Sequence, residues 1–401
     1  MGDNTLYNIL MYSHDTYGLG HIRRSMAIAA HLRADDVNVL ILTGSPIAGR
    51  FSFPQNVDFV RIPGMIKKTN EEYRSLSIRI DPEHALGIRK SIILATARSF
   101  QPDLFIVDKE PLGLKREVLP TLEWLRHHHR RTRTILGLRD IMDDRETVCR
   151  DWRHKNVYRC LDELYSEIWI YGRRDIYDAV REYSIPEQVE EKVVYTGYLA
   201  RKVVSAGQAA SARRQFCVRP GERMIVLTTG GGGDGYGMMD AYLAMHEQYG
   251  LEGVRSVLIT GPFMPKKYRR ELSRRGRRFG IKVRPFYPRM EEAFAAADLV
   301  VSMGGYNTLC EILSQGTPSL IIPRETPRRE QLIRARAFKA QGLIDCIPWS
   351  ELTPERFREQ LTGMLADLPA YRRTIAGFRL EGIETIRRRL DLFRHRDGLS
   401  C

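Results

Sequence analysis

The chain has 401 residues, of which 43% are hydrophobic and 28% charged, and this composition argues against a disordered protein. Its length exceeds the needs of one small core and predicts two domains of ordinary size. The formal net charge of +14 indicates affinity for anions: a nucleotide sugar, anionic lipid headgroups or nucleic acid.

Targeting and membrane signals are not visible in the sequence. The chain opens on an apolar run without the basic-then-apolar leader of a secretory signal. No apolar run approaches the roughly 20 residues of a membrane span. The six cysteines are scattered, which favours reduced and mostly buried thiols. We therefore expect a cytoplasmic protein, and we leave open peripheral contact with the inner face of a membrane.

Short β-branched runs alternate with longer amphipathic stretches, which is typical of parallel α/β sheets. In the first half, strands are predicted at Leu6–Ser13, Val37–Leu42, Val57–Ile62, Leu104–Val107, Thr134–Leu138, Ile168–Tyr171 and Val193–Tyr195. The intervening helices are predicted at Ile22–Leu32, Glu83–Phe100, Leu114–His128 and Trp152–Tyr165. The polar segment Gly64–Asp81 is expected to be an irregular loop over a site. These elements predict one Rossmann-like domain over residues 1–198.

Two features of this half suggest a binding site. A glycine loop, Gly18-Leu-Gly20-His21, follows the first strand and allows close approach of a ligand to the backbone, although its spacing is not the GxGxxG fingerprint. Glu110 and the pair Arg139–Asp140 follow two later strands at their carboxyl ends, where such folds bind ligands. Contact with an acceptor and a structural ion pair, such as Asp108 with Arg139, are equal alternatives for them.

A run of three histidines within residues 127–133 suggests a metal site. Consecutive residues point in different directions, however, and no carboxylate completes a ligand set, so a solvated basic turn is favoured.

The second half repeats the α/β scheme. Strands are predicted at Met224–Thr229, Ser256–Ile259, Lys282–Pro285, Leu299–Ser302, Ser319–Ile322 and Asp345–Ile347, with helices between them. They predict a second domain over residues 199–370. Apolar residues at helical spacing predict one long helix from about Ala370 to Arg396, within a tail of residues 371–401.

A glycine cradle follows the strand Met224–Thr229. Gly230, Gly231 and Gly232, followed by Gly233, offer backbone donors for phosphate, and a merely flexible loop is the alternative. Asp234 would repel a diphosphate, so we expect it to point away or to bind a sugar hydroxyl.

The densest basic run covers residues 266–284. A solvated helix face is the favoured interpretation, followed by contact with an anionic membrane. No signature of a nucleic-acid-binding fold accompanies the charge, so no nucleic-acid partner is expected.

The stretch from Asp298 to Gln331 combines a buried strand, a glycine turn and a helix. In such a turn the N–H groups of Tyr306, Asn307 and Thr308 lack intrahelical partners and, with the helix dipole, form an anion site that suits phosphate. Glu311, one turn further on, could hold the two hydroxyls of a ribose. Glu330 and Gln331 open the next helix and could reach a sugar.

The order of residues across this region resembles the donor-binding signature of family 28, MurG-like glycosyltransferases. The matching positions are Phe286, Met290, Ala297–Asp298, Gly305, Thr308, Glu311, Gly316–Pro318 and Gln331. The resemblance implies the α/β GT-B fold, in which two Rossmann-like, doubly wound domains face a cleft and a terminal helix crosses back to the N-terminal domain. It also implies that the first domain binds the acceptor and the second the donor.

The resemblance assigns roles to individual residues. It implies that Arg201 faces the donor diphosphate, that Phe286 and Tyr287 flank the nucleobase, and that Gln331 reads the sugar. In the family an asparagine stands three positions after this glutamine, where this chain has Arg334. Gly18 and Gly20 are assigned to the donor as well.

In the first domain the resemblance makes His21 the general base. His14 or Asp15 could serve instead, and a histidine that caps the helix is a further alternative. Arg23 and Arg24 could hold an anionic acceptor or be solvated. The residues expected to contact the acceptor are His14, Arg23, Glu110, Arg139 and Asp140.

The resemblance implies an inverting, metal-independent transfer of a sugar from a nucleotide donor, with UDP favoured, to an acceptor hydroxyl, and no cofactor. The acceptor would be lipid-linked or a glycan, in cell-envelope, polysaccharide or glycolipid synthesis. A nucleotide-sugar 2-epimerase of the same fold and a non-catalytic nucleotide-sugar-binding protein are the alternatives.

Overall fold

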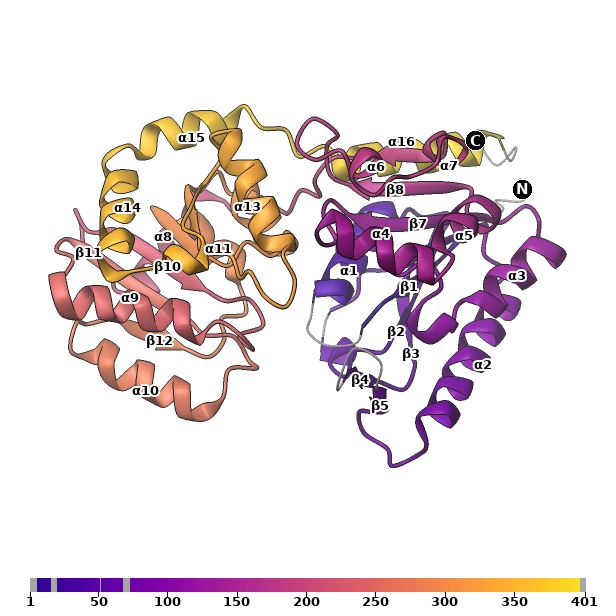
Figure 1. Ribbon diagram of the computed structural model, residues 1–401, viewed down its shortest axis with the longest axis horizontal. Coiled ribbons are helices and arrows are strands. Elements are labelled where there is room, and N and C mark those ends of the chain that lie inside the picture. The colour runs from indigo at the N-terminus through magenta and orange to yellow at the C-terminus, as the bar shows by residue number, and fades with distance from the viewer. Residues whose placement is uncertain (1–5, 16–19, 51, 68–72, 397–401) are drawn as a thin grey trace. The chain divides into compact units, whose positions relative to one another are not determined.

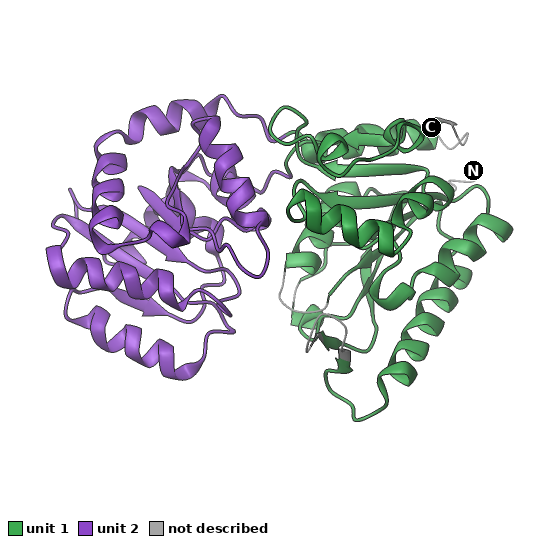
Figure 2. Cartoon of the chain, viewed as in Figure 1, with its two compact units in different colours: residues 1–198, 381–401 green, residues 199–380 purple. Residues whose placement is uncertain are grey.

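The computed structural model describes residues 6–15, 20–50, 52–67 and 73–396 and divides into two compact units (Figures 1 and 2). Unit 1 comprises Met1–Tyr198 and Glu381–Cys401, and unit 2 comprises Leu199–Leu380. The chain therefore leaves unit 1 once and returns to it at its C-terminal end.

Unit 1 is built on a parallel sheet of seven strands within the described residues. The strands are β1 (Tyr7–Ser13), β2 (Val37–Thr43), β3 (Val57–Arg61), β6 (Leu104–Asp108), β7 (Arg133–Arg139), β8 (Glu167–Tyr171) and β9 (Val193–Tyr195). They are ordered β3-β2-β1-β6-β7-β8-β9, so the chain changes direction across the sheet between β1 and β6. In open α/β sheets, such a switch point is where the carboxyl ends of the strands form a ligand site.

Helices cover this sheet, in part differently from the prediction. They are α1 (Gly20–Leu32), α2 (Pro82–Phe100), α3 (Leu119–His128), α4 (Arg145–His154), α5 (Val157–Leu164), and the short α6 (Ala179–Glu182) and α7 (Glu187–Glu190).

The predicted helix over Leu114–His128 is wrong in its first turn, because Lys115 and Arg116 have positive φ. The predicted helix Trp152–Tyr165 is broken by Asn156 at φ 55°. Within Gly64–Asp81, a β4–β5 hairpin (Met65–Lys67 and Tyr73–Ser75) replaces part of the predicted irregular loop.

The predicted single tail helix is also wrong. The structure has α15 (Leu368–Ala376) in unit 2 and α16 (Gly382–Arg396) in unit 1. In α16, Phe393 stacks on Trp169 of β8, and Arg389 pairs with Glu167 at the start of the same strand. The last helix is therefore part of the packing of unit 1.

Unit 2 has a second parallel sheet, of six strands in the described part of the chain. The strands are β10 (Arg223–Thr228), β11 (Val254–Ile259), β12 (Lys282–Arg284), β13 (Leu299–Ser302), β14 (Ser319–Ile321) and β15 (Asp345–Cys346), ordered β12-β11-β10-β13-β14-β15. The helices of unit 2, besides α15, are α8 (Ala206–Gln215), α9 (Tyr236–Tyr249), α10 (Lys266–Arg277), α11 (Met290–Ala296), α12 (Tyr306–Ser314), α13 (Glu330–Ala340) and α14 (Pro354–Ala366). The switch point here lies between β10 and β13.

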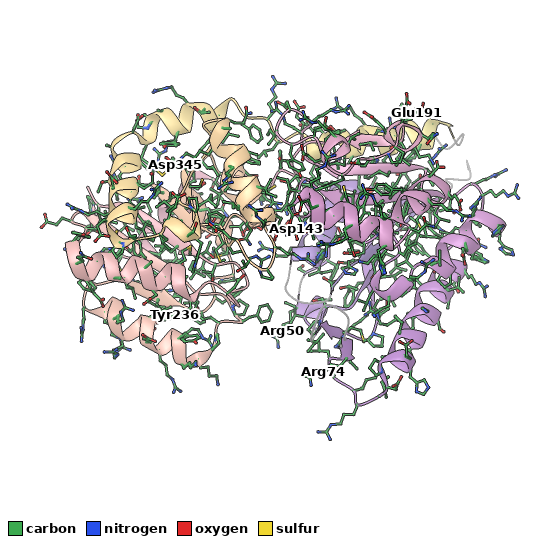
Figure 3. All side chains as sticks on the ribbon, viewed as in Figure 1. Arg50, Arg74, Asp143, Glu191, Tyr236 and Asp345 are labelled. Carbon is green, nitrogen blue, oxygen red and sulfur yellow. The ribbon has the colours of Figure 1, made fainter. Side chains whose placement is uncertain are left out.

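The central strands of both sheets supply the two cores. Ile9 and Phe105 in unit 1, and Leu227 and Val301 in unit 2, are fully buried. In unit 2, Tyr236 of α9 (labelled in Figure 3) stacks on Tyr268 of α10, with ring centroids 4.3 Å apart. Because residues at the carboxyl ends of central strands are anchored in these cores, they are held rigidly at the two switch points.

Candidate functional site

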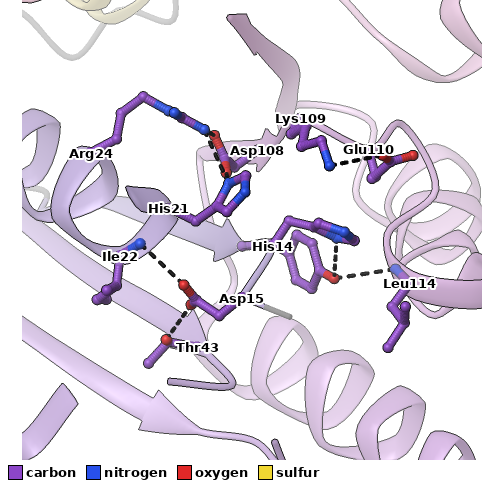
Figure 4. Close-up of polar contacts among 11 residues, drawn as sticks. His14, Asp15, His21, Ile22, Arg24, Thr43, Asp108, Lys109, Glu110 and Leu114 are labelled. Carbon is purple, nitrogen blue, oxygen red and sulfur yellow. Dashed lines mark hydrogen bonds and ion pairs between the residues drawn. The ribbon is translucent and has the colours of Figure 1, made fainter. Parts of the chain in front are cut away.

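The switch point of unit 1 holds a histidine–carboxylate pair. His21 lies in the first turn of α1, and Asp108 is the last residue of the adjacent strand β6. The Nδ1 atom of His21 is 2.5 Å from Oδ2 of Asp108 (Figure 4). An ionised carboxylate only accepts hydrogen bonds, so Nδ1 carries the proton and donates it to Asp108. The other ring nitrogen, Nε2, is then unprotonated and able to take a proton.

Arg24 completes this cluster from the next turn of α1. Its Nε and Nη2 atoms donate to Oδ1 of Asp108 at 3.0 and 2.5 Å, and its side chain is 2% exposed. Arg24 is therefore buried as a partner of Asp108, whereas the sequence left open whether it holds an anionic acceptor or is solvated.

The electrostatics of the cluster keep His21 neutral and Asp108 ionised. Burial lowers the pKa of His21 to about 4, although Asp108 opposes the shift. Burial would raise the pKa of Asp108, but the charge of Arg24 and the hydrogen bond from His21 outweigh it and hold that pKa below its usual value. At neutral pH the pair is therefore in the form that a general base requires.

His14 lies beside His21, with ring centroids 5.8 Å apart. Its Nδ1 atom is 3.3 Å from the hydroxyl of Tyr12, and that hydroxyl donates to Oε1 of Glu117 at 2.5 Å. Burial, followed by the charge of Lys109, lowers the pKa of His14 well below its usual value. His14 is thus a neutral, 5% exposed side chain at the edge of the cluster.

The other residues predicted for the acceptor divide into two groups. Glu110, whose carboxylate lies 3.3 Å from Nζ of Lys109, is near His14, outside the cluster of His21, Arg24 and Asp108 (Figure 4). Asp140 is 1% exposed and accepts the backbone N–H of Ile141, so the structure argues for a local structural role. Arg23 and Arg139 are half-buried, on α1 and at the end of β7.

Asp15 caps α1. Its carboxylate accepts the backbone N–H of Ile22 at 3.1 Å and the hydroxyl of Thr43 at 2.5 Å. Both contacts occupy its oxygens, which favours His21 over Asp15 as the base. Gly20 begins α1, whereas Gly18 lies outside the described residues.

The switch point of unit 2 presents the N-terminus of α12. Gly304 has φ 73°, and a Cβ there would lie 2.7 Å from Cγ2 of Ile321. Gly305 is the N-cap residue and offers no side-chain cap to the first turn, which contains Tyr306, Asn307 and Thr308. The turn predicted from the glycines therefore forms, and it aims the positive end of the helix dipole outward.

Arg201 reaches this helix end from the first residues of unit 2. Its Nη2 atom donates to Oδ1 of Asn307 at 3.1 Å, and its backbone N–H donates to Ser314 at 2.9 Å. The buried Nη1 atom of Arg201 has no hydrogen-bond partner among the described residues. A guanidinium held in this way offers donors suited to the oxygens of a phosphate.

The glycine loop after β10 faces the same helix. A Cβ on Gly230 would lie 3.9 Å from the hydroxyl of Thr308. Gly230 and Gly232 have positive φ, and their N–H groups donate within the loop, to Thr228 and Thr229. Their contribution is therefore the shape of the loop rather than those two donors.

The loop is closely packed at two of its glycines. A Cβ on Gly231 would lie 3.2 Å from the ring of Phe263, and one on Gly232 would lie 2.1 Å from the carbonyl oxygen of Thr260.

The predicted nucleoside-binding residues differ in how exposed their side chains are. Glu311 lies on α12, one turn beyond the glycine turn, and is 2% exposed. Phe286 is 55% exposed, as a ring that stacks on a base would need to be. Tyr287 is 3% exposed, packs on Phe216 and donates to Gln215, so it is a core residue and the prediction that it flanks the base is not supported.

The residues predicted to contact the sugar form hydrogen bonds with Arg324, which was not predicted from the sequence as a site residue. Arg324 follows β14. Its backbone N–H donates to Oε1 of Gln331 at 3.1 Å, and its Nη2 atom donates to Oε1 of Glu330 at 2.7 Å. Arg334 is 1% exposed and donates to the carbonyl oxygen of Gly304 at 3.2 Å, so it supports the glycine turn from beneath.

Within the described ranges, no group of three or more His, Cys, Asp or Glu side chains is placed to hold a metal ion. Over the same residues, no helix is long and apolar enough to cross a membrane.

Comparison with known proteins identifies the C-terminal half. Residues 240–386 match the glycosyltransferase family 28 C-terminal domain. Over 183 residues, 45% of this chain, the sequence is 31% identical to the Clostridioides difficile UDP-N-acetylglucosamine–N-acetylmuramyl-(pentapeptide) pyrophosphoryl-undecaprenol N-acetylglucosamine transferase. The match spans 44% of that protein, so the chain covers less than half the length of this relative.

Solved structures match along nearly the whole chain. The MurG of Acinetobacter baumannii has a TM-score of 0.63 at 13% identity, with 97% of this chain and 99% of that chain covered. The UDP-GlcNAc 2-epimerase of Neisseria meningitidis, bound to UDP-GlcNAc, has a TM-score of 0.62 at 12% identity over 97% and 99%. At these identities the likeness shows the fold alone, and it confirms the predicted GT-B fold of two Rossmann-like units. Together with the sequence match, it confirms the predicted resemblance: residues 240–386 match the C-terminal domain of glycosyltransferase family 28, and the chain is similar to MurG-type proteins over that half.

Proposed function

We propose that the chain is an inverting glycosyltransferase that moves a sugar from a UDP-sugar to an acceptor hydroxyl. The observation that carries the proposal is the match of residues 240–386 to the family 28 C-terminal domain. The matched range includes the N-terminus of α12, which we propose as the anion site. In this proposal unit 2 binds the donor and unit 1 supplies the base.

The chemistry follows from the two sites. Nε2 of His21 takes the proton of the acceptor hydroxyl as its oxygen attacks the anomeric carbon. The bond from that carbon to the diphosphate breaks, and the charge on the leaving diphosphate is stabilised by the first turn of α12 and by Arg201. These cationic and dipolar groups support a metal-independent departure. Single displacement inverts the configuration at the anomeric carbon.

Further roles in the donor site are assigned by position. Glu311 holds the ribose hydroxyls, Phe286 lies against the base, and Gln331 and Glu330 face the sugar. The glycine loop, Gly230–Gly232, encloses the diphosphate together with Gly305, Tyr306, Asn307 and Thr308.

The acceptor is proposed to be a lipid-linked or glycan hydroxyl of cell-envelope synthesis, because the matched relatives are named for transfer to a pyrophosphoryl-undecaprenol acceptor. His14, beside His21, and Glu110, which lies on the side of His14 away from His21, are the residues best placed to contact it (Figure 4). Exposed cations on α10, including Arg270, Arg274 and Arg277, would favour an anionic membrane surface as the place of reaction.

A thermal-shift screen against UDP, GDP, dTDP and UDP-sugars tests the donor site. A ligand at about 100 times its dissociation constant stabilises the folded protein by about 2.7 kcal/mol, so we expect a clear rise in melting temperature with UDP species alone. A rise with GDP or dTDP instead would change the nucleotide. No rise with any of them would remove the support for a nucleotide-sugar enzyme.

Alanine substitution at two neighbouring glycines tests the loop. Gly232→Ala combines φ 88° with a Cβ 2.1 Å from Thr260 O, whereas Gly233→Ala meets nothing within 4 Å. We expect Gly232→Ala to weaken UDP binding, measured by calorimetry, by about tenfold or more, which corresponds to roughly 1.4 kcal/mol. Gly233→Ala is the matched control and should bind as wild type does. Equal affinities would show that the shape of the loop is not used by the donor.

A nucleotide-sugar 2-epimerase is the second candidate, because the epimerase structure matches the fold as well as the MurG structure does. The two are separated by the product. Incubation with UDP-GlcNAc and no acceptor should leave the sugar stereochemistry unchanged in a transferase. A 2-epimerase would invert the configuration at C2 of the sugar, and free UDP would form only if water also cleaves the bond from the sugar to the diphosphate.

A further inference from the structure

The ion pair between Asp234 and Arg324 crosses the carboxyl edge of the sheet in unit 2. Asp234 belongs to the glycine loop after β10, and Arg324 follows β14. Nη1 of Arg324 donates to Oδ2 of Asp234 at 2.8 Å. In the sheet, β13 lies between β10 and β14, and all three strands are parallel. The guanidinium therefore lies across the end of β13, where the glycine turn leads into α12.

The two carboxylates that hold Arg324 differ in their surroundings. The side chain of Glu330 is 5% exposed, and its contact with Nη2 of Arg324 anchors the guanidinium to the start of α13. The side chain of Asp234 is 48% exposed. Solvent-exposed ion pairs contribute little to stability, so the contact with Asp234 is easily exchanged for a stronger one.

The guanidinium also has donor capacity left. Nε of Arg324 is buried without a hydrogen-bond partner among the described residues. Burial would lower the pKa of Arg324, but Glu330 and Asp234 outweigh it, so the side chain carries its full charge. Release of Asp234 leaves the N–H groups of Nη1 to donate to a phosphate oxygen in a charge-assisted hydrogen bond.

We propose that Arg324 is a further diphosphate-binding residue, which gives up Asp234 for the donor's diphosphate while Glu330 keeps the guanidinium in place. This inference rests on the proposed donor site. It assigns Asp234 a function of its own: a carboxylate in the glycine loop competes with the ligand for Arg324. Binding then replaces a weak internal ion pair by a charge-assisted contact with the ligand.

Calorimetric titration of the full chain with UDP, inorganic pyrophosphate and uridine tests the proposal. Arg324→Met should weaken binding of UDP and pyrophosphate by about 10- to 100-fold, the range expected for charged hydrogen bonds, and leave uridine unchanged. Asp234→Asn should strengthen binding of both phosphate ligands by several-fold, because the competitor is removed. Arg328→Met removes the same charge from the same loop, and this control should change neither phosphate ligand by more than a small factor.

The outcomes separate the inference from the proposed function. UDP binding that Arg324→Met leaves intact would overturn the inference and leave the donor site standing. Pyrophosphate binding that depends on Arg324, without any UDP binding, would support the inference and overturn the nucleotide-sugar function. If Arg324→Met does not fold, Asp234→Asn decides alone, since a purely structural ion pair predicts weaker or unchanged binding in that variant. No binding of either phosphate ligand by the wild-type protein would overturn both.

Discussion

Replacing His21 by alanine is expected to lower the turnover of sugar transfer by about 10²–10⁴-fold, the usual contribution of a general base, without changing the affinity for UDP. The reason is geometric. Asp108 accepts the hydrogen bond from Nδ1–H and so leaves Nε2 as the basic nitrogen, whereas the donor contacts proposed above belong to unit 2. Initial rates at saturating UDP-sugar, together with a calorimetric titration of UDP, measure the two quantities separately.

A matched control comes from the same helix. His31 is exposed near the end of α1, and Nδ1 of its ring lies 2.7 Å from the carbonyl oxygen of Ala27. His31→Ala should therefore transfer sugar at the wild-type rate. If His21→Ala also kept the wild-type rate, the base would have to be another residue. If the wild-type protein bound UDP and transferred no sugar, a binding protein would be the better description.

The pH dependence gives an independent measure of the same group. Burial lowers the pKa of His21 to about 4, so the neutral, basic form is complete at pH 7 and is lost only as the pH falls through about 4. The acidic limb of the pH–rate profile is expected near that value, with circular dichroism used to exclude unfolding. A limb near 6.5, the ordinary pKa of histidine, would mean that the base is solvated and does not lie in the cluster of His21, Arg24 and Asp108.

The fold was largely predictable because both sheets consist of short, buried, β-branched strands. Each predicted strand overlaps an observed one, as with Val193–Tyr195. The failures came from backbone conformation. Asn156 at positive φ divides a continuous helical pattern into α4 and α5, and nothing in the apolar spacing marks that break. The tail pattern likewise continued through the break between α15 and α16.

The geometry of the proposed donor site was more predictable than that of the proposed base site for a physical reason. The glycine turn and the start of α12 are adjacent in sequence, so their geometry is local. Asp108 and His21 are 87 residues apart and meet only because β6 pairs with β1. The carboxyl end of the strand Leu104–Val107 was the available signal. The role of Arg324 was not predicted for the same reason: its partner Asp234 lies 90 residues earlier in the chain.

The largest effect on stability is expected at a buried ion pair behind the base site. Arg89 of α2 donates from Nε and Nη2 to both oxygens of Glu117, at 2.5 Å each, and from Nη1 to Pro63. The side chains are 1% and 0% exposed. Tyr12 donates to the same carboxylate.

Glu117→Gln keeps the shape of the side chain but leaves the charge of Arg89 buried without a counter-ion. We expect the free energy of unfolding of unit 1 to fall by about 3–5 kcal/mol.

Urea unfolding followed by tryptophan fluorescence measures this change. Trp152 and Trp169 are buried in unit 1, and Trp349→Phe removes the tryptophan of unit 2 from the signal. Glu123→Gln, at an exposed position of α3, is the matched control and should shift the free energy by less than about 0.5 kcal/mol.

A triple variant separates the loss of the ion pair from the loss of packing. Tyr12→Phe, Arg89→Met and Glu117→Leu together remove every partner of the buried carboxylate and keep comparable side-chain volume. Apolar replacement of a whole buried ion pair is often neutral, so this variant should recover most of the stability lost in Glu117→Gln. If it is as unstable as the single variant, packing around Glu117 rather than an uncompensated charge determines the loss. If stability is recovered, the triple variant is a folded protein in which His14 has lost its contact with the Tyr12 hydroxyl. The rate of sugar transfer in this variant would then report whether that contact supports the proposed base site.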